Sequence, residues 1–197
     1  MLRKTQKAAA RRTGTAARDK LRPLAAERAG SWHLARTETE RHLSEFEFTL
    51  ERLAQAYYRW KAACLAAVCD VPLTGDDVAV LNVVRMGDEP KRLSEIGQLL
   101  NRVDVPNMQY ATRKLVRAGL IETEGSSSRK ETRYRATESG HEVTEAYAAL
   151  RATTLPPMLD ALDGGAANLA TTSIQMDLVT SLYGQAAQVA ITRRHQP

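Results

Sequence analysis

The stretch RLSEIGQLLNRVDVPNMQYATRKLVRAGL, residues 92–120, decides the fold because it contains two helical patterns separated by only a few residues. In the first pattern, Ser94 stands at a cap-like position before an apolar run. In the second, Asp104 can cap a helix that ends at Gly119, because glycine readily adopts the left-handed conformation found just beyond a helix. Two short helices joined by so tight a turn predict a helix-turn-helix.

The second helix divides into two chemically different halves when its residues are placed at intervals of about 100°. The packing half contains Val105, Met108, Ala111, Thr112, Leu115, Val116 and Ala118. The polar half has no carboxylate and consists of Pro106, Asn107, Gln109, Tyr110, Arg113, Lys114 and Arg117. A solvated helix face usually mixes both charge signs, so the absence of acids favours an anionic partner over plain solvent.

The polar half has the chemistry needed to bind double-stranded DNA. Asn and Gln can pair with adenine edges, and Arg with guanine edges, in a major groove that is wide enough for a helix. We expect base contacts from Asn107, Gln109, Tyr110 and Arg113. We expect phosphate contacts from Lys114 and Arg117. An ordinary solvated face is the alternative.

The segments on either side complete a winged helix-turn-helix. Upstream, residues 73–84 predict a short helix capped by Thr74, with an acid three residues later. Downstream, residues 120–137 predict a β-hairpin whose tip is Gly-Ser-Ser-Ser. A further helix is expected to start near Glu138 and to end at the Pro-Pro pair 156–157.

The second half of the hairpin is strongly basic, with four cations between residues 129 and 135 opposed only by Glu131. In a winged helix this ribbon reaches the minor groove or its phosphates, where the negative potential favours Arg. We therefore expect DNA backbone contacts from Arg129, Lys130 and Arg133. A solubilised hairpin is the alternative.

Two long apolar stripes flank this central region. From about Glu38 to Val68, and again from Leu169 to Ala190, apolar side chains recur every three or four residues. Neither helix has an obvious small-domain core to cover. We therefore expect both to pack together and against a second copy of the chain, although an intramolecular bundle would have the same pattern.

The net charge of +5 is concentrated at the start of the 197-residue chain. Residues 1–31 contain nine Lys or Arg and two acids, which leaves the remainder near −2. This arm has too few apolar residues to fold by itself. It is either a solubilising tail or an arm that adds nonspecific affinity for nucleic acid.

The predicted fold class is therefore mainly α with a small β-hairpin wing. We expect a basic, disordered arm (1–31), an N-terminal dimerisation helix (32–71), a winged helix-turn-helix DNA-binding domain (72–140) and C-terminal helices that complete the dimerisation layer (141–197).

Enzymatic and membrane functions lack support in the sequence. There is no apolar run long enough to span a membrane and no secretory signal. Cys64 and Cys69 match neither a redox pair nor zinc-ligand spacing, which suggests free thiols in a reducing cytoplasm. No nucleophile motif or phosphate loop is present, so we expect no catalysis, cofactor or metal. The four histidines are scattered at His33, His42, His141 and His195.

The stretch RLSEIGQLLNRVDVPNMQYATRKLVRAGLIETEGSSSRKETRYRATESG, residues 92–140, resembles the MarR family of bacterial transcription regulators. The resemblance includes the helix-turn-helix, the Gly-Leu exit, the wing and a closing Thr-x-x-Gly at 137–140. The two long helices extend it over roughly 33–192. It implies a cytoplasmic homodimer, associated with the nucleoid when DNA-bound, that binds a pseudo-palindromic operator, usually as a repressor. The alternative is a winged-helix protein-interaction module or scaffold without sequence-specific DNA binding.

Members of this family often release DNA when a small aromatic or anionic effector binds between the dimer helices and the winged domain. Tyr57, Tyr58 and Trp60 could line such a pocket, although their spacing also fits core and seam packing. Cys64 and Cys69 could sense oxidants, as in some family members, or be buried inert thiols. The sequence departs from the family in the wing, where Ser-Arg-Lys at 128–130 replaces the common Asp-x-Arg.

Overall fold

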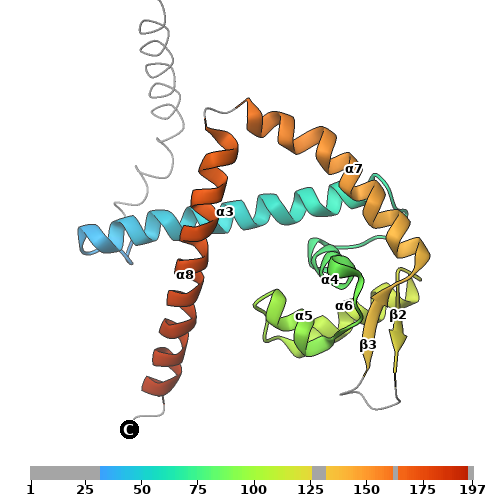
Figure 1. Cartoon of the computed structure of the whole chain (residues 1–197). Coiled ribbons are helices and arrows are strands. Elements are labelled where there is room, and N and C mark those ends of the chain that lie inside the picture. The colour runs from blue at the N-terminus through green and yellow to red at the C-terminus, as the bar shows by residue number, and fades with distance from the viewer. Residues whose placement is uncertain (1–31, 126–131, 162–163, 195–197) are drawn as a thin grey trace, which may run out of the picture. The chain divides into compact units, whose positions relative to one another are not determined.

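The computed structural model describes residues 32–125, 132–161 and 164–194 (Figure 1). The chain divides into two compact units, Met1–Leu150 and Arg151–Pro197. Its helices are α3 (Glu38–Ala66), α4 (Gly75–Arg85), the 3-10 turn η1 (Met86–Asp88), α5 (Leu93–Leu99), α6 (Val105–Arg117), α7 (Glu138–Asp160) and α8 (Gly165–Arg194). Its strands are β1 (Lys91–Arg92), β2 (Ile121–Glu124) and β3 (Arg133–Ala136). Of the helices described, none combines the length and apolar character needed to cross a bilayer.

Helix α4 lies at the centre of the first unit, where it packs against α3, α5, α6 and β3. It begins with the predicted cap: Asp77 N donates to Thr74 Oγ1, and Thr74 N donates to Asp77 Oδ2. These reciprocal bonds satisfy amides that a helix start leaves without partners. The buried side chains of α4 join a single apolar core with residues from α3, α5, α6 and β2, among them Leu65, Leu81, Ile96, Leu115 and Ile121.

The predicted helix-turn-helix is confirmed, but its first helix starts differently from the expectation. The N-cap of α5 is Arg92, whose backbone N–H donates to the Glu95 carboxylate at 2.6 Å. The prediction that Ser94 caps this helix is therefore wrong, because Glu95 already satisfies the amide one turn earlier. Asn101 adopts a left-handed φ of 51°, which closes α5 and leads directly into α6.

The hairpin is confirmed, and a third strand extends it. β2 and β3 are antiparallel, with Thr123 opposite Tyr134. On its other edge β3 pairs with β1, where Lys91 lies opposite Tyr134, so the strand order is β1-β3-β2. β1 was not predicted, because a two-residue strand is too short to have an alternating pattern.

The two long terminal helices form where the apolar stripes predicted them. α3 has a complete capping box between Thr37 and Glu40. The last turns of α3 enter the core through Cys64 and Leu65, whereas Leu53 nearer its N-terminus is 51% exposed.

Helix α7 does not end at Pro156 and Pro157, as the sequence predicted, but continues to Asp160. Proline fixes φ close to the helical value, so a helix can pass through it with the loss of a backbone hydrogen bond. The two prolines lie within the last turns of α7, and the helix ends shortly after them at Asp160.

Candidate nucleic-acid interface

One half of α6 is buried and the other faces outward, as the sequence predicted. Met108, Ala111, Thr112 and Leu115 are buried. The exposed side chains of the opposite half are Pro106, Asn107, Tyr110, Arg113 and Arg117, with Gln109 half-buried beside them. Within the residues described, neither Arg113 nor Arg117 takes part in an ion pair, so both guanidinium groups are open to a ligand.

Two apolar residues of α6 depart from the expected division. Val105 is 46% exposed and Val116 is 37% exposed, although both were assigned to the packing half. That assignment is wrong because both residues lie at the edge of the half, beyond the reach of the core. The outward surface of α6 is therefore bordered by valine methyl groups.

The end of α6 brings the chain directly into the wing. Gly119 has a φ of 69°, and Leu120 N donates to Leu115 O at 3.1 Å, which is the expected closure of a helix by a left-handed residue. Thr137 N then donates to Leu120 O at 3.1 Å, so the end of the wing is fixed to the exit from α6. This bond holds the base of the hairpin at the C-terminal end of α6.

Lys114, for which a phosphate contact was predicted, is engaged within the protein. Its Nζ lies 2.7 Å from Asp77 Oδ2 on α4. The Asp77 side chain is only 5% exposed and that of Lys114 only 25% exposed. The polar half of α6 has no acid of its own, but α4 supplies one. The predicted contact between Lys114 and phosphate stays a prediction, and it would have to compete with this ion pair.

The start of α6 contains a second polar network, which was not predicted from the sequence. Arg102 donates to both carboxylate oxygens of Asp104, from Nε at 2.8 Å and Nη2 at 2.6 Å, and also to Asp76 at 3.2 Å. Asn107 Nδ2 donates to Asp104 at 3.1 Å. Asp104 stands at the N-cap position as predicted, but its carboxylate binds Arg102 and Asn107 and makes no capping bond.

The pKa values of this network follow from its hydrogen bonds. The Arg102 guanidinium, with help from Asn107, holds the pKa of Asp104 well below its usual range. The same bond to Asp104 raises the pKa of Arg102. Both groups are therefore charged across the physiological range. Asn107 remains exposed but is oriented by Asp104, so its amide is held in one direction at the first turn of α6.

The described part of the wing has its cations bound to neighbouring groups. Arg133 is half-buried and its Nη1 donates to Pro90 O at 3.2 Å. Arg135 donates to Glu122 across the strands at 2.6 Å. The other two predicted wing contacts, Arg129 and Lys130, lie outside the described residues. A DNA contact from Arg133 therefore remains a prediction that would require its side chain to leave Pro90.

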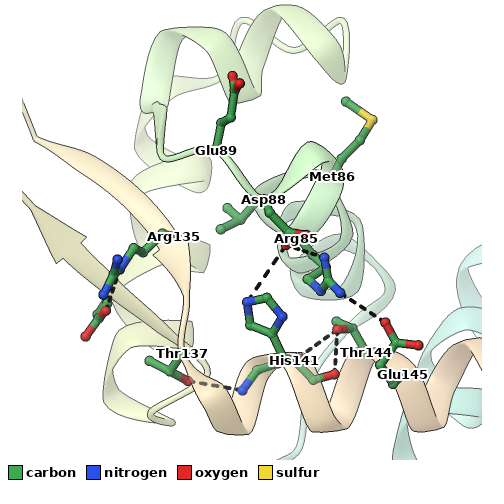
Figure 2. A network of polar contacts seen from close by, with 12 residues as sticks. Arg85, Met86, Asp88, Glu89, Arg135, Thr137, His141, Thr144 and Glu145 are labelled. Carbon is green, nitrogen blue, oxygen red and sulfur yellow. Dashed lines mark hydrogen bonds and ion pairs between the residues drawn. The ribbon is translucent and has the colours of Figure 1, made fainter.

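A cluster of ionic contacts links α4 and α7 near the base of the wing (Figure 2). Arg85 pairs with Asp88 and, at 3.0 Å, with Glu145 of α7. His141 Nε2 lies 3.9 Å from the same Asp88. Figure 2 shows these side chains converging between the two helices. They fix α7 against the end of α4.

The first turn of α7 is packed very closely against the exit from α6. Gly140 N donates to Thr137 Oγ1 at 3.0 Å, and Thr137 Oγ1 donates to Gly119 O at 2.6 Å. A Cβ at residue 140 would lie 2.0 Å from Leu120 O, so only glycine fits there. This contact explains the Thr-x-x-Gly that the sequence carries at the end of the wing.

The aromatic residues predicted for an effector pocket are brought together near the end of α3. Tyr57 stacks on Trp60 with a centroid distance of 6.4 Å, and Tyr58 lies edge-on to Tyr57 at 6.1 Å. Trp60 also contacts Tyr147 of α7 at 6.2 Å. Effector binding by these rings stays a prediction. Their packing on one another fits the alternative, in which they belong to the core and to the apolar stripe of α3.

A buried cation that the sequence did not indicate lies among these rings. Lys61 is 2% exposed, with Nζ 4.4 Å from the Tyr57 ring centroid and 4.0 Å from that of Tyr58. Burial lowers the pKa of Lys61 and raises that of Tyr58, and the charge of Asp76 raises both pKa values.

The two cysteines are free, with Cys64 buried and Cys69 half-buried. Oxidant sensing by either thiol stays a prediction. Among the residues described, no three His, Cys, Asp or Glu side chains are grouped so as to hold a metal ion.

The comparison of sequences identifies the central region. Residues 73–140 match the family described as "Winged helix DNA-binding domain". This range begins just before α4 and ends in the first turn of α7, so it contains the whole interface described above. No curated protein sequence matches the chain significantly.

Solved structures with the same fold extend the likeness to the long helices. AbfR of Staphylococcus epidermidis is 15% identical with a TM-score of 0.58, and the match covers 76% of this chain and 99% of AbfR. Reduced AbfR bound to DNA is 17% identical with a TM-score of 0.58, covering 75% of this chain and 96% of that one.

A third structure, Sco5413 from Streptomyces coelicolor, is described as a MarR family transcriptional regulator. It is 20% identical with a TM-score of 0.54, and the match covers 68% of this chain and 91% of Sco5413. At these identities the likeness establishes a shared fold. Residues 73–140 match a winged helix DNA-binding domain, and the chain that contains them shares its fold with solved structures that include a MarR family transcriptional regulator.

Proposed function

We propose that the protein is a transcriptional regulator of the MarR type, which binds double-stranded DNA as a homodimer and represses from a pseudo-palindromic operator. The observation that carries this proposal is the outward half of α6. There Tyr110 is 59% exposed, and Arg113 and Arg117 are exposed without an ion pair among the described residues. The DNA complex of AbfR, which has the same fold, adds support.

In this proposal α6 is the recognition helix and enters the major groove. Gln109, Tyr110 and Arg113 contact base edges, because they lie within about one turn of each other on the outward half. Asn107 can still present its carbonyl oxygen while its amide donates to Asp104. Arg117, at the C-terminal end of the helix, contacts phosphate and so fixes the orientation of α6 without reading sequence.

We infer a dimer for two reasons. The exposed apolar side chains of α3 offer a surface for a second chain, and the geometry of DNA suits a pair of recognition helices. A two-fold dimer that places its recognition helices in successive major grooves needs them about 34–36 Å apart. Such a dimer reads two inverted half-sites separated by one helical turn.

A small aromatic or anionic effector is proposed to bind beside Tyr57, Tyr58 and Trp60, where the Lys61 ammonium would attract an anion. Benzoate is a suitable probe. We expect it to weaken DNA binding by the wild type, and an equal effect on Lys61→Met would contradict the role of Lys61.

The central experiment is selection of a binding sequence from random duplexes, followed by anisotropy titrations of the wild type and Arg113→Ala. Loss of one bidentate contact to guanine should cost about 1–3 kcal/mol, which is roughly 5- to 150-fold in affinity. Arg59→Ala, which removes an exposed arginine from α3, is the matched control and should bind normally.

The wild type should also lose affinity steeply with salt, with a slope of several units in log K against log salt. A flat salt response, or selection that enriches no sequence, would contradict the proposal. Either result would favour the alternative of a winged helix that binds protein.

A further inference from the structure

Two acids in the first turn of α4 each form an ion pair with a cation. One of these cations lies just before α6, and the other lies within α6. Asp77 pairs with Lys114 at 2.7 Å, and its neighbour Asp76 pairs with Arg102 at 3.2 Å. Lys114 belongs to α6, and Arg102 lies in the turn before it. Asp77 and Lys114 are 37 residues apart in the sequence. They meet only because α4 packs against α6.

Asp77 is fixed in place by bonds that do not depend on Lys114. Its Oδ2 accepts from Thr74 N at 2.8 Å and from Thr74 Oγ1 at 2.9 Å. The carboxylate that completes the cap of α4 is therefore already oriented when Lys114 reaches it. A pair in which one partner is almost fully buried is screened by salt much less than an exposed pair.

Lys114 would be able to reach DNA if it were released. It lies one turn after Tyr110 and three residues before Arg117, both of which are exposed on the outward half of α6. Its four-carbon stem is flexible and its ammonium can bind phosphate without a fixed geometry. The ion pair instead directs the ammonium toward α4.

We propose that Asp77 is a positioning residue that withholds Lys114 from DNA, so that α6 presents only Arg113 and Arg117 as free cations to its target. This inference rests on the proposed function, because it concerns how α6 binds DNA. A lysine bound to phosphate adds affinity for every sequence alike. By sequestering Lys114, Asp77 makes binding depend more on the base contacts of the outward half.

The test uses the full-length protein and a duplex that lacks the selected operator, with binding measured over a range of salt concentrations. Asp77→Asn keeps an oxygen acceptor for Thr74 but weakens the hold on Lys114. We expect it to bind this duplex more tightly than the wild type does. The slope of log K against log salt should steepen by about 0.9 for each protomer that contacts DNA.

Three further variants identify the cause of any change. Lys114→Gln should leave the slope at the wild-type value, because the proposal gives Lys114 no phosphate contact. The double variant Asp77→Asn with Lys114→Gln should return to that value as well. Asp70→Asn makes the same change in net charge at an exposed position before α4, and it should have no effect.

The opposite pattern would overturn the inference. If Lys114→Gln lowers the slope by about 0.9 per protomer while Asp77→Asn leaves it unchanged, Lys114 contacts phosphate in the wild type. That result would leave the proposed DNA-binding function intact, whereas a wild type without DNA affinity would overturn both. Should Asp77→Asn fail to fold, a lowered slope for Lys114→Gln would still overturn the inference, because this variant leaves the Thr74 cap in place.

Discussion

Helices α6 and α3 differ in where their apolar side chains find partners. The packing residues of α6, such as Leu115 at 0% exposure, are buried within one protomer. Along α3, Leu43, Leu53 and Tyr57 are 49%, 51% and 53% exposed, and only its last turns enter the core. Exposed apolar surface of this kind commonly marks an interaction site. The packing of α6 is therefore complete in one chain, whereas α3 has a surface suited to a second chain.

The largest effect is expected when a buried residue of α6 is truncated. Leu115→Ala should lower the free energy of unfolding by about 2–5 kcal/mol, because it leaves a cavity in the core. Chemical denaturation followed by circular dichroism measures this loss. Leu99→Ala removes the same atoms from a side chain that is 53% exposed and should cost under about 1 kcal/mol. Equal losses in the two variants would mean that α6 is not anchored as described.

The next effect should appear in assembly. Leu53→Asp places a charge on the exposed stripe of α3, where a partner would have to desolvate it. We expect the dimer dissociation constant to rise at least tenfold, which is about 1.4 kcal/mol. Sedimentation or light scattering over a dilution series checks this. Gln55→Asp, exposed on the other side of α3, is the control. A dimer unaffected by Leu53→Asp, or a monomeric wild type, would remove the contrast between α3 and α6.

A smaller effect is expected at the cap of α4, the helix on which α6 rests. Thr74→Ala removes the acceptor for Asp77 N and should cost about 1 kcal/mol. Thermal denaturation will measure it. Thr49→Ala on α3 removes an exposed hydroxyl that bonds only to its own helix, so its stability should stay near the wild type. If Thr49→Ala lowered stability as much as Thr74→Ala, the cap of α4 would not contribute as described.

The smallest effect concerns acid. The folded-state pKa of Asp104 lies below its ordinary value because of Arg102, so its contribution to stability is present at neutral pH. That contribution is lost as the pH falls from about 4 through the folded pKa, because the unfolded chain then binds more protons. Asp104→Asn should therefore have a flatter dependence of stability on pH below about 4 than the wild type. Asp70→Asn should retain the wild-type dependence, and an unchanged curve for Asp104→Asn would contradict the network.

The parts of the fold that the sequence predicted correctly depend on signals close together in the chain. The cap at Thr74, the stop at Gly119 and the periodic stripes of the long helices each involve residues only a few positions apart. The order of elements then indicated a winged helix-turn-helix. The wrong cap at Ser94 shows the limit of such signals, because Glu95 offered a competing partner one residue away.

The parts that could not be predicted depend on contacts between distant segments. The prediction that the polar half of α6 contains no acid was correct for α6 itself. However, Asp77 of α4 approaches this half and pairs with Lys114. The hydrogen bond from Arg133 to Pro90 O could not be predicted either, because the two residues are 43 positions apart in the sequence. The burial of Lys61 could not be predicted from the sequence, because lysine side chains usually face solvent.

The close contact at Gly140 has a consequence for protein engineering. Leu120 and Thr137 are joined by a backbone hydrogen bond, and Gly140 packs on the same carbonyl, so the base of the hairpin is fixed to the exit from α6 and to the start of α7. Exchange of an exposed side chain on the described strands, such as Glu124, would leave the register of β2 and β3 unchanged. The base of the hairpin is thus a platform on which surface side chains can be replaced without redesign of α6 or of the core.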